Sequence, residues 1–471
     1  MKRQAIALMS LILIFLSPLF SAVSAKASSL EDSSDWPDGP GVFAESAIVM
    51  EASTGLILYE KNMDEVHYPA SITKIMTALL AIENSNLGEI VTFSKKAIFD
   101  VDLNSSRIGI DVGEQLTMQQ CLYAILLESA NEVSYAVAEH VAGSAEEFAK
   151  MMTERAKSLG CENTNFINPH GLHDDNHYTS AHDMALITRE AMKNETFRKI
   201  FGTRTYQIPP TNIQDESRYC ANHHRFILKQ TYRYDDCIGG KTGYTSKSRY
   251  TLVSVAKRGD LELICVVMRD DTSAHQYTDT QKLFDFGFDN FSVYTIGDQE
   301  TAQILEESPM FTRYNPLLST AATPIITDEK GYLILPNSAS SLDAKKEVTF
   351  YPASEQTTTL NSNTVIGKIS YTYLGKYVGG ADILYHNNET LRLVQSPAEK
   401  NNPTSTPENP VPEKADKSLR PIILGGIIGL FVLITVIYFI LVERPRLKRR
   451  SAYYKKRARR KLYNDNDFLD L

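Results

Sequence analysis

The apolar residues of 71–84 recur at helical spacing, three or four positions apart. This is the period of a helix that buries one face, and Pro69 suits the helix start. The pattern therefore predicts a helix to about Asn84. The same spacing predicts helices over 146–159, 180–194 and 278–288, and over 117–143 with an interruption at Ser129-Ala130-Asn131.

Short β-rich runs lie on both sides of this helical block. Residues 46–50 and 56–59 flank a turn, and 252–256 and 261–268 flank another. Because strands lie at both ends of this region and helices fill the middle, the sequence predicts one sheet with an inserted helical subdomain. We expect a cleft where the sheet and the helices meet.

The following residues, 292–395, alternate short strands with turns and carry no chemical motif. We predict a small β-rich domain there, acting as a spacer or contact surface. Residues 396–420 are polar and rich in proline, which predicts a disordered stalk.

Residues 421–442 form an uncharged apolar run that is long enough to span a bilayer. A basic segment follows over 443–471, and lysine and arginine mark the cytoplasmic side. We therefore predict one transmembrane helix with the body outside and the tail inside, where its basic residues lie along anionic headgroups.

The first 27 residues have the order of a secretory signal: Lys2-Arg3, an apolar run, then small residues. Cleavage after Ala25 and cleavage after Ala27 both fit. Residues 28–42 are rich in Ser, Asp, Gly and Pro and predict a flexible leader.

The charge of the chain is unevenly distributed. The formal net charge is −8, although the tail over 443–471 holds 11 Lys/Arg against 4 Asp/Glu. An acidic outer body with a basic tail argues against nucleic acid as a partner. Five cysteines are too few and too scattered for a disulfide framework. Pairing of Cys220 with Cys237, which flank an expected hairpin, is left open.

Ser71 and Lys74 are the first candidates for chemistry. They lie three residues apart, so on a helix they share a face and the amine can reach the hydroxyl. A serine nucleophile without a histidine needs such a base. The pair alone is weak evidence, since this spacing arises by chance in a long chain. Ser129-Ala130-Asn131 and Lys241-Thr242-Gly243 follow in order, and the three motifs together are typical of penicillin-recognising serine enzymes.

Longer segments around these motifs carry a resemblance to a known family. The sequence resembles the low-molecular-mass D-alanyl-D-alanine carboxypeptidases, penicillin-binding proteins of the S11 peptidase family, from about Ala44 to Phe291 and more weakly to about Val394. The resemblance implies an α+β fold of the β-lactamase/transpeptidase type, with an antiparallel sheet, over 43–291. The matching segments are Tyr68-Pro69-Ala70-Ser71-Ile72-Thr73-Lys74, Leu127-Glu128-Ser129-Ala130-Asn131-Glu132, Asn168-Pro169-His170-Gly171-Leu172 and Gly240-Lys241-Thr242-Gly243-Tyr244-Thr245.

The resemblance implies a role for each motif. Ser71 attacks a peptide carbonyl, and Lys74 takes its proton while uncharged because burial and nearby Lys241 lower its pKa. Ser129 relays a proton to the leaving amine. The substrate-binding residues implied are Asn131, Lys241, Thr242, Gly243 and Tyr244, with the backbone N–H groups of Ser71 and Tyr244 as the oxyanion hole. Lys241 is expected just before an edge strand of the sheet, where it and Thr242 can bind the terminal carboxylate of the substrate.

Two segments depart from the family pattern. Ser246-Lys247-Ser248-Arg249 stands where the family has an Ala-Gly pair. The family also often has an arginine shortly after the second of the two late strands. In this sequence that region reads Asp271 to Gln276, and Arg269 is displaced. These departures bear on substrate preference more than on reaction class.

We therefore expect a membrane-anchored serine carboxypeptidase that cuts the terminal D-alanine from peptidoglycan stem pentapeptides and is acylated by β-lactams. No cofactor or metal is expected. Four histidines within 170–182 raise the question of zinc, but no H-E-x-x-H motif accompanies them, and packing within a loop is the simpler interpretation. A β-lactamase and a non-catalytic β-lactam or muropeptide sensor remain alternatives. The class A glutamate motif is absent from the sequence.

Overall fold

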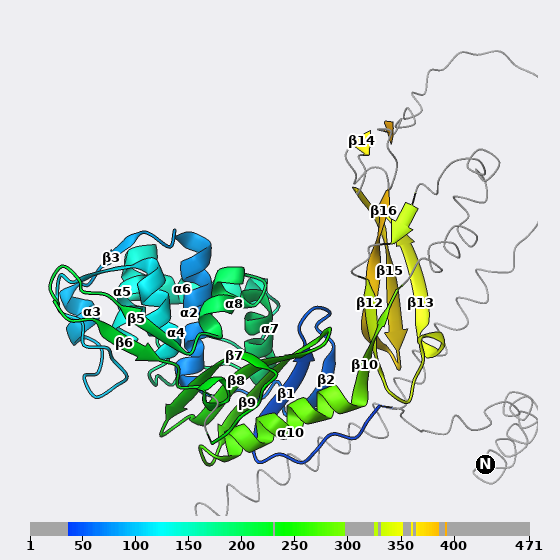
Figure 1. The fold of residues 1–471 in the computed structure, drawn as a ribbon, viewed down its shortest axis with the longest axis horizontal. Helices are drawn as coiled ribbons and strands as arrows, with labels where there is room; N and C mark the ends of the chain where they lie inside the picture. Colours follow the sequence, from blue (N-terminus) through cyan, green and yellow to red (C-terminus); the bar gives the residue numbers. More distant parts are fainter. Residues whose placement is uncertain are drawn as a thin grey trace, which may run out of the picture. The chain divides into compact units, whose positions relative to one another are not determined.

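Strands from both ends of the catalytic region form one five-stranded antiparallel sheet in the computed structural model (Figure 1). The structure describes residues 36–228, 231–296, 325–327, 331–351, 359–360, 364–385 and 391–392. The strand order is β2-β1-β9-β8-β7, so β7 is an edge strand. The strands are β1 (Ser46–Glu51), β2 (Ile57–Lys61), β7 (Cys237–Thr245), β8 (Arg249–Arg258) and β9 (Leu261–Asp270).

Period-two alternation divides the central strands between two hydrophobic clusters. In β1, Ile48 and Met50 belong to the cluster on the helical side, whereas Ala47 and Val49 belong to the cluster that contains α10 (His275–Asn290). Because both faces are covered, every residue of β1 is buried.

The helical subdomain surrounds α2 (Lys74–Asn84), which packs on α4, α5, α6, α7 and α8 (Figure 1). The chain interruption predicted at Ser129 is confirmed, because α4 ends at Leu127 and α5 begins at Asn131. The other helices are α3 (Lys95–Phe99), α4 (Met118–Leu127), α5 (Asn131–Ala142), α6 (Ala145–Ser158), α7 (Ala181–Ala191), α8 (Glu195–Phe201) and α9 (Arg225–Leu228).

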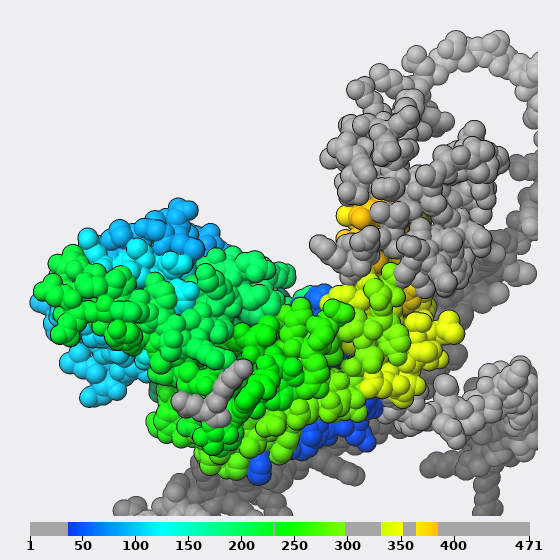
Figure 2. Space-filling model, viewed as in Figure 1, coloured from blue at the N-terminus to red at the C-terminus, as the bar shows by residue number. Residues whose placement is uncertain are grey.

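Two short hairpins border this subdomain. Strands β3 (Ile90–Thr92) and β4 (Gln115–Thr117) pair with each other, and so do β5 (Thr205–Ile208) and β6 (Arg218–Ala221). Figure 2 shows the surface of the β5–β6 segment, in green, beside the blue and cyan surface of 90–117. Segments about 100 residues apart in the sequence therefore lie side by side.

Two expectations need correction. The first turn of the serine helix is a 3₁₀ turn, η1 (Ala70–Thr73), and the α-helix begins only at Lys74. Lys241 does not lie before the edge strand, because β7 already begins at Cys237. The prediction overlooked that Cys237-Ile238-Gly239-Gly240 continues the strand, with a bulge between Cys237 and Gly239 in its pairing with β8.

The β-rich region after α10 forms a second sheet. Its order is β10-β12-β16-β15-β13, and β11 pairs with β16. Its apolar residues join the α10 cluster, and Tyr332 Oη donates to Glu51 Oε1 at 3.1 Å. The strands are β10 (Phe291–Thr295), β11 (Ile325–Thr327), β12 (Tyr332–Pro336), β13 (Lys345–Phe350), β15 (Thr364–Tyr373) and β16 (Lys376–Tyr385), beside a 3₁₀ turn η2 (Ser341–Asp343) and a separate pair β14 (Thr359–Leu360) and β17 (Leu391–Arg392).

Several predictions concern parts of the chain that the structure does not describe. The signal over 1–27, the stalk over 396–420, the span over 421–442 and the tail over 443–471 all lie outside the described residues. Within those residues, no helix combines the length and the apolar character that crossing a membrane requires. All five cysteines are described and free, so Cys220 and Cys237 do not pair. The predicted domain boundaries stay a prediction.

Candidate active site

The hydroxyl of Ser71 lies 3.0 Å from the amine of Lys74. Ser71 is in η1, and Lys74 is the first residue of α2, so the two side chains are one turn apart on the same side. Ala70 has a left-handed φ of 52°, which bends the chain into this turn. Thr251 of β8 holds the turn from outside by donating to the carbonyl of Pro69 at 2.9 Å.

Lys74 is completely buried and has three polar neighbours. Its Nζ lies 2.6 Å from Asn131 Oδ1, 2.6 Å from the carbonyl oxygen of His170, and 3.0 Å from Ser71 Oγ. Burial holds the pKa of Lys74 well below its usual range, and the charge of Lys241 lowers that pKa further against the opposing effect of Glu132.

The geometry around Lys74 suits an uncharged amine. A neutral lysine has two N–H donors and one lone pair. Two of its neighbours, the oxygens of Asn131 and His170, only accept hydrogen bonds. They therefore take the two N–H donors, and the lone pair faces the hydroxyl of Ser71. This is the arrangement in which Lys74 can accept the Ser71 proton.

The loop of Asn168 to Leu172 positions the carbonyl of His170. Asn168 Oδ1 accepts from the backbone N–H groups of His170 and Gly171, and its Nδ2 donates to the carbonyl of Leu172. Gly171 has a φ of 84°, and a Cβ built on it would lie 1.9 Å from the carbonyl oxygen of Ala70. Only glycine fits there, because the loop packs directly against the Ser71 turn.

His177 supports the same turn from the next part of the loop. Its Nδ1 accepts from the backbone N–H of Ile167 at 3.0 Å, and its Nε2 lies 2.9 Å from Thr73 Oγ1. Burial lowers the pKa of His177 to about 3, so the ring is neutral and carries its proton on Nε2. The histidine donates to Thr73, which agrees with a packing role in the loop.

Ser129 lies in the short link between α4 and α5, across the site from Ser71. Its φ is 60°, and its Oγ is buried with no hydrogen-bond partner among the described residues. A buried hydroxyl that lacks a partner is unusual and costly. Its position on the wall of the cavity in front of Ser71 leaves it available to a bound substrate.

The edge strand β7 contains the third motif, Lys241-Thr242-Gly243, and places it beside Ser71. A Cβ on Gly243 would lie 3.0 Å from the backbone N of Ser71 and 2.4 Å from Thr251 Oγ1, so a side chain is excluded there. Lys241 is buried, and its Nζ donates to the carbonyl of Thr242 at 3.0 Å. Burial lowers the pKa of Lys241 to about 7, with Glu128 opposing this effect.

The three motifs meet at one cavity of about 320 Å³. Ser71, Ser129, Thr242, Gly243 and Tyr244 line it, whereas Lys74, Asn131 and Lys241 lie behind this wall. The remaining lining residues are Ser106, His223, Arg225, Tyr250, Ser273, Gln276 and Tyr277. Two contributions were missed from the sequence: the backbone carbonyl of His170, which leaves no side-chain signal, and the cavity position of Arg225.

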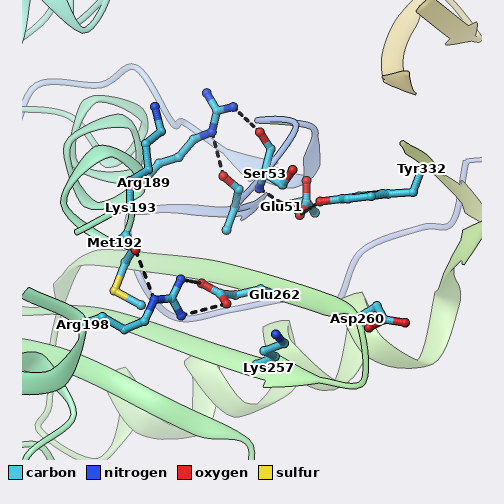
Figure 3. Close-up of a pocket in the computed structure, with 11 residues that line it drawn as sticks. Glu51, Ser53, Arg189, Met192, Lys193, Arg198, Lys257, Asp260, Glu262 and Tyr332 are labelled. Carbon is cyan, nitrogen blue, oxygen red and sulfur yellow. Dashed lines mark hydrogen bonds and ion pairs between the residues drawn. The ribbon is translucent and has the colours of Figure 1, made fainter. Parts of the chain in front are cut away.

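A larger cavity, of about 420 Å³, lies away from these motifs (Figure 3). Arg198 and Glu262 form two hydrogen bonds of 3.0 and 2.8 Å across it, and Arg189 donates to the backbone carbonyls of Ala52 and Ser53. Its arginines are thus engaged in holding α7 and α8 to the sheet. No group of histidine, cysteine and acidic side chains that could hold a metal ion occurs among the described residues.

Comparisons with known proteins agree with this geometry. Residues 34–272 match the family model for D-alanyl-D-alanine carboxypeptidase, Peptidase_S11. D-alanyl-D-alanine carboxypeptidase DacF of Bacillus subtilis (strain 168) is 37% identical over 255 residues, which are 54% of this chain and 64% of DacF. DacA of Haemophilus influenzae is 29% identical over 379 residues, which are 78% of this chain and 91% of DacA.

A solved structure shows the same fold. Penicillin binding protein 5 from Haemophilus influenzae superposes with a TM-score of 0.56 at 24% identity, covering 74% of this chain and 98% of its own. The match to DacF leaves more than a third of that relative uncovered. The family model spans about half of the present chain. The chain belongs to the D-alanyl-D-alanine carboxypeptidases of peptidase family S11.

Proposed function

We propose that this protein is a serine-type D-Ala-D-Ala carboxypeptidase that removes the terminal D-alanine from peptidoglycan stem pentapeptides. The observation that carries the proposal is the 3.0 Å contact between Ser71 Oγ and Lys74 Nζ, with Nζ buried and its two other neighbours acceptors only. Membership of the S11 family and the names of the relatives support the same activity.

In the acylation step, Ser71 Oγ attacks the carbonyl of the penultimate D-alanine and its proton passes to Lys74 Nζ. The new C–O bond gives a tetrahedral intermediate, whose oxygen is stabilised by the backbone N–H groups of Ser71 and Tyr244. The C–N bond then breaks. Ser129 relays a proton to the departing amine, and D-alanine leaves an acyl-enzyme that water hydrolyses to regenerate Ser71.

The substrate backbone adds to the free edge of β7. That edge carries Thr242, Gly243 and Tyr244, and the absence of a side chain at Gly243 lets the Ser71 turn lie directly against the strand. Asn131 holds the amine of Lys74 from behind the cavity wall, while the buried Lys241 contributes its charge to the electrostatic potential of the cavity. A β-lactam resembles the D-Ala-D-Ala end and acylates Ser71 in the same way.

Mass spectrometry of a stem pentapeptide incubated with the purified protein tests this function. We expect loss of one terminal D-alanine, and no loss with S71A. Penicillin labelling without release of D-alanine would favour the sensor alternative. Rapid hydrolysis of penicillin, with a short-lived acyl-enzyme, would favour a β-lactamase.

We further propose that the protein is anchored in the cell membrane by the helix predicted over 421–442, with the catalytic domain outside and the basic tail inside. The support is the uncharged apolar run and the arginines and lysines that follow it. Protease added to intact protoplasts should remove the catalytic domain and spare the tail. Protection of the catalytic domain would contradict this topology.

A further inference from the structure

The direction of the Ser129 side chain depends on the backbone of the short link between α4 and α5. The Ser129 hydroxyl is buried and has no hydrogen-bond partner among the described residues, so no side-chain contact fixes it there. Ser129 also has a left-handed φ of 60°, which a residue other than glycine keeps only where its surroundings hold the backbone. The contacts that hold this link therefore also decide where the hydroxyl points.

Glu128, the residue just before Ser129, ties the link to the segment that follows β6. Its Oε1 accepts a hydrogen bond from the backbone N–H of Ala221 at 2.6 Å, and its Oε2 lies 3.2 Å from Nε2 of His223. Although burial acts to raise it, the pKa of Glu128 is lowered by the hydrogen bonds from His223 and Ala221. Glu128 is therefore ionised near neutral pH, and hydrogen bonds to a charged acceptor are the stronger kind.

Other contacts of the link lie within the helical subdomain. The backbone N–H of Ala130 donates to the carbonyl of Ala124 in α4 at 3.2 Å, and that of Asn131 donates to the carbonyl of Ser106 at 2.9 Å. These bonds fix the link to its own side of the site. Glu128 differs from them, because its side chain reaches toward the sheet.

The segment that Glu128 contacts, residues 221–224, is itself fixed to the sheet. The buried ring of His224 lies 2.8 Å, through its Nε2, from Ser254 Oγ of β8. The same ring packs against Gly240 of β7, where a built Cβ would lie 2.3 Å from Cδ2 of His224. The hydrogen bonds of Glu128 therefore end on a segment that β7 and β8 hold in place.

Glu128 thus forms a bridge between the two sides of the cavity in front of the nucleophile. Ser129 enters this cavity from the helical side, Thr242 enters it from β7, and His223 also lines it. The link between α4 and α5 cannot move away from β7 without breaking both hydrogen bonds of Glu128. The distance between Ser129 and a substrate lying on β7 therefore depends on this bridge.

We propose that Glu128 is a positioning residue, which holds Ser129 where its hydroxyl can pass a proton to the departing amine. This inference rests on the proposed function, because it concerns the leaving-group step of that reaction. Ser71 Oγ forms the bond to the carbonyl carbon, and its proton goes to Lys74. The C–N bond then breaks, and the nitrogen receives a proton through Ser129. A leaving group that departs without a proton does not need this arrangement.

The test compares two substrates that differ only in the bond that breaks. One is a peptide that ends in D-Ala-D-Ala, and in the other a sulfur atom replaces the nitrogen of that last bond. A thiol has a pKa of about 8.5, so the thiolate leaves without a proton, whereas an amine does not leave as its anion. In E128A we expect kcat/KM for the amide to fall by about 10- to 100-fold, because the proton donor is misplaced. For the thioester, kcat/KM should change by less than about twofold.

The two substrates also separate this role from an effect of Glu128 on Lys241. Burial lowers the pKa of Lys241 to about 7, and the charge of Glu128 opposes this effect. Loss of Glu128 would therefore also reduce the positive charge behind the cavity wall. Both substrates end in the same carboxylate, so that change would alter both rates alike. The ratio of the amide rate to the thioester rate reports on the Ser129 hydroxyl.

Reference variants make this ratio interpretable. S129A removes the relay itself and should lower the ratio at least as much as E128A. The double variant E128A/S129A should show the ratio of S129A, because two changes that act through one group are not additive. E128Q keeps an oxygen that can accept from Ala221. It should lie between E128A and the wild type, and it carries the same prediction if E128A does not fold.

E147A is the matched control. Glu147 is an exposed glutamate of α6 that pairs with Lys150 and does not line the cavity. Both rates should therefore stay at the wild-type level in this variant.

Equal falls for the two substrates in E128A, or no fall for either, would overturn the positioning role and leave the proposed function standing. A ratio that falls in S129A and stays unchanged in E128A would do the same. An unchanged ratio in S129A would overturn the relay through Ser129 and with it the role of Glu128. A wild-type protein that releases no D-alanine from the amide would overturn the proposed function, and the role of Glu128 would fall with it.

Discussion

Lys74 forms no ion pair with any acidic side chain of the described residues, although burying a charged lysine without a partner is costly. Its two short hydrogen bonds go to a side-chain amide and a backbone carbonyl, so the site binds the amine without stabilising its charged form. The position of the His170 carbonyl depends on the backbone conformation of Gly171. The two acceptor oxygens take no part in the reaction themselves, but they orient the amine that activates Ser71.

Gly171 gives the sharpest prediction for a single residue. In G171A the new Cβ would lie 1.9 Å from the carbonyl oxygen of Ala70, so the turn that holds Ser71 must shift. We expect the rate of acylation by a fluorescent penicillin to fall on the order of 100-fold, as a misplacement of about 1 Å can cause.

G160A is the matched control for this change. Gly160 also has a left-handed φ, of 88°, but a Cβ there meets nothing within 4 Å. It should lose about 1 kcal/mol of stability and keep its acylation rate. Equal acylation rates in the two variants would show that the contact with Ala70 is unimportant.

The order of the motifs indicated the side chains at the reaction centre, since Ser71, Lys74 and Asn131 lie within hydrogen-bond reach. The carbonyl of His170 could not be predicted from side-chain chemistry, because every residue has a carbonyl. Arg225 was missed because its place depends on packing against Tyr232 and against Tyr277, and Tyr277 lies in a segment distant in sequence.

At the scale of elements, one buried ion pair joins the β5–β6 hairpin to the loop before β4. Glu114, just before β4, is buried and accepts two hydrogen bonds from Arg218 of β6, at 2.6 and 3.0 Å. Thr211 donates to the same carboxylate, and Arg218 also reaches the carbonyl of Gly109. This network therefore joins two segments that lie more than 100 residues apart in the sequence.

Replacement of Arg218 should therefore destabilise the folded protein strongly. R218M leaves Glu114 buried without its charge partner, and we expect a loss of about 3 kcal/mol in the free energy of unfolding, measured in urea. R233M changes an exposed arginine and should cost little. A similar small loss in both variants would argue that the Arg218–Glu114 pair does not hold the hairpin.

The positions of most helices and strands could be predicted from the sequence, but their first and last residues were harder to predict. The apolar period fixed α2 and its end at Asn84, whereas the 3₁₀ start at Ala70 depends on contacts with β8 and the Gly171 loop. The start of β7 was predicted too late in the sequence, because glycines are poor strand formers. Gly239 and Gly240 belong to the strand because they pair with β8.

At the scale of the whole molecule, the five-stranded sheet lies between two hydrophobic clusters. An acidic residue is buried at the end of one of its strands. Asp270, at the end of β9, is fully buried, and neither of its carboxylate oxygens has a hydrogen-bond partner among the described residues. Burial, with the nearby acids Asp279 and Asp271, raises its pKa to about 8, while Lys61 acts in the opposite direction. The folded protein therefore keeps this carboxyl protonated in neutral solution.

This raised pKa predicts a pH dependence of stability. Between about pH 4 and about pH 8 the folded state holds a proton that the unfolded state has released, so rising pH favours unfolding. Asp270→Asn removes this contribution. We expect the fall in stability from about pH 5 to about pH 8 to be smaller than in the wild type by on the order of 3 kcal/mol.

Thermal and urea unfolding across that pH range provide the measurement. D260N is the control, because Asp260 is exposed in the turn between β8 and β9 and should leave the pH profile unchanged. Parallel profiles for D270N and the wild type would show that Asp270 is ionised in the folded protein. The sequence gives no sign of this group, because its burial results from the packing of α10 on the sheet.

The most direct measurement for the account as a whole is the site of covalent attachment of penicillin. The protein is incubated with the compound, digested, and analysed by tandem mass spectrometry. We expect one adduct on Ser71, and none in S71A, because among the described residues only that hydroxyl lies against the buried amine of Lys74 at the cavity. An adduct on Ser129 or on another residue, or undiminished labelling of S71A, would contradict it.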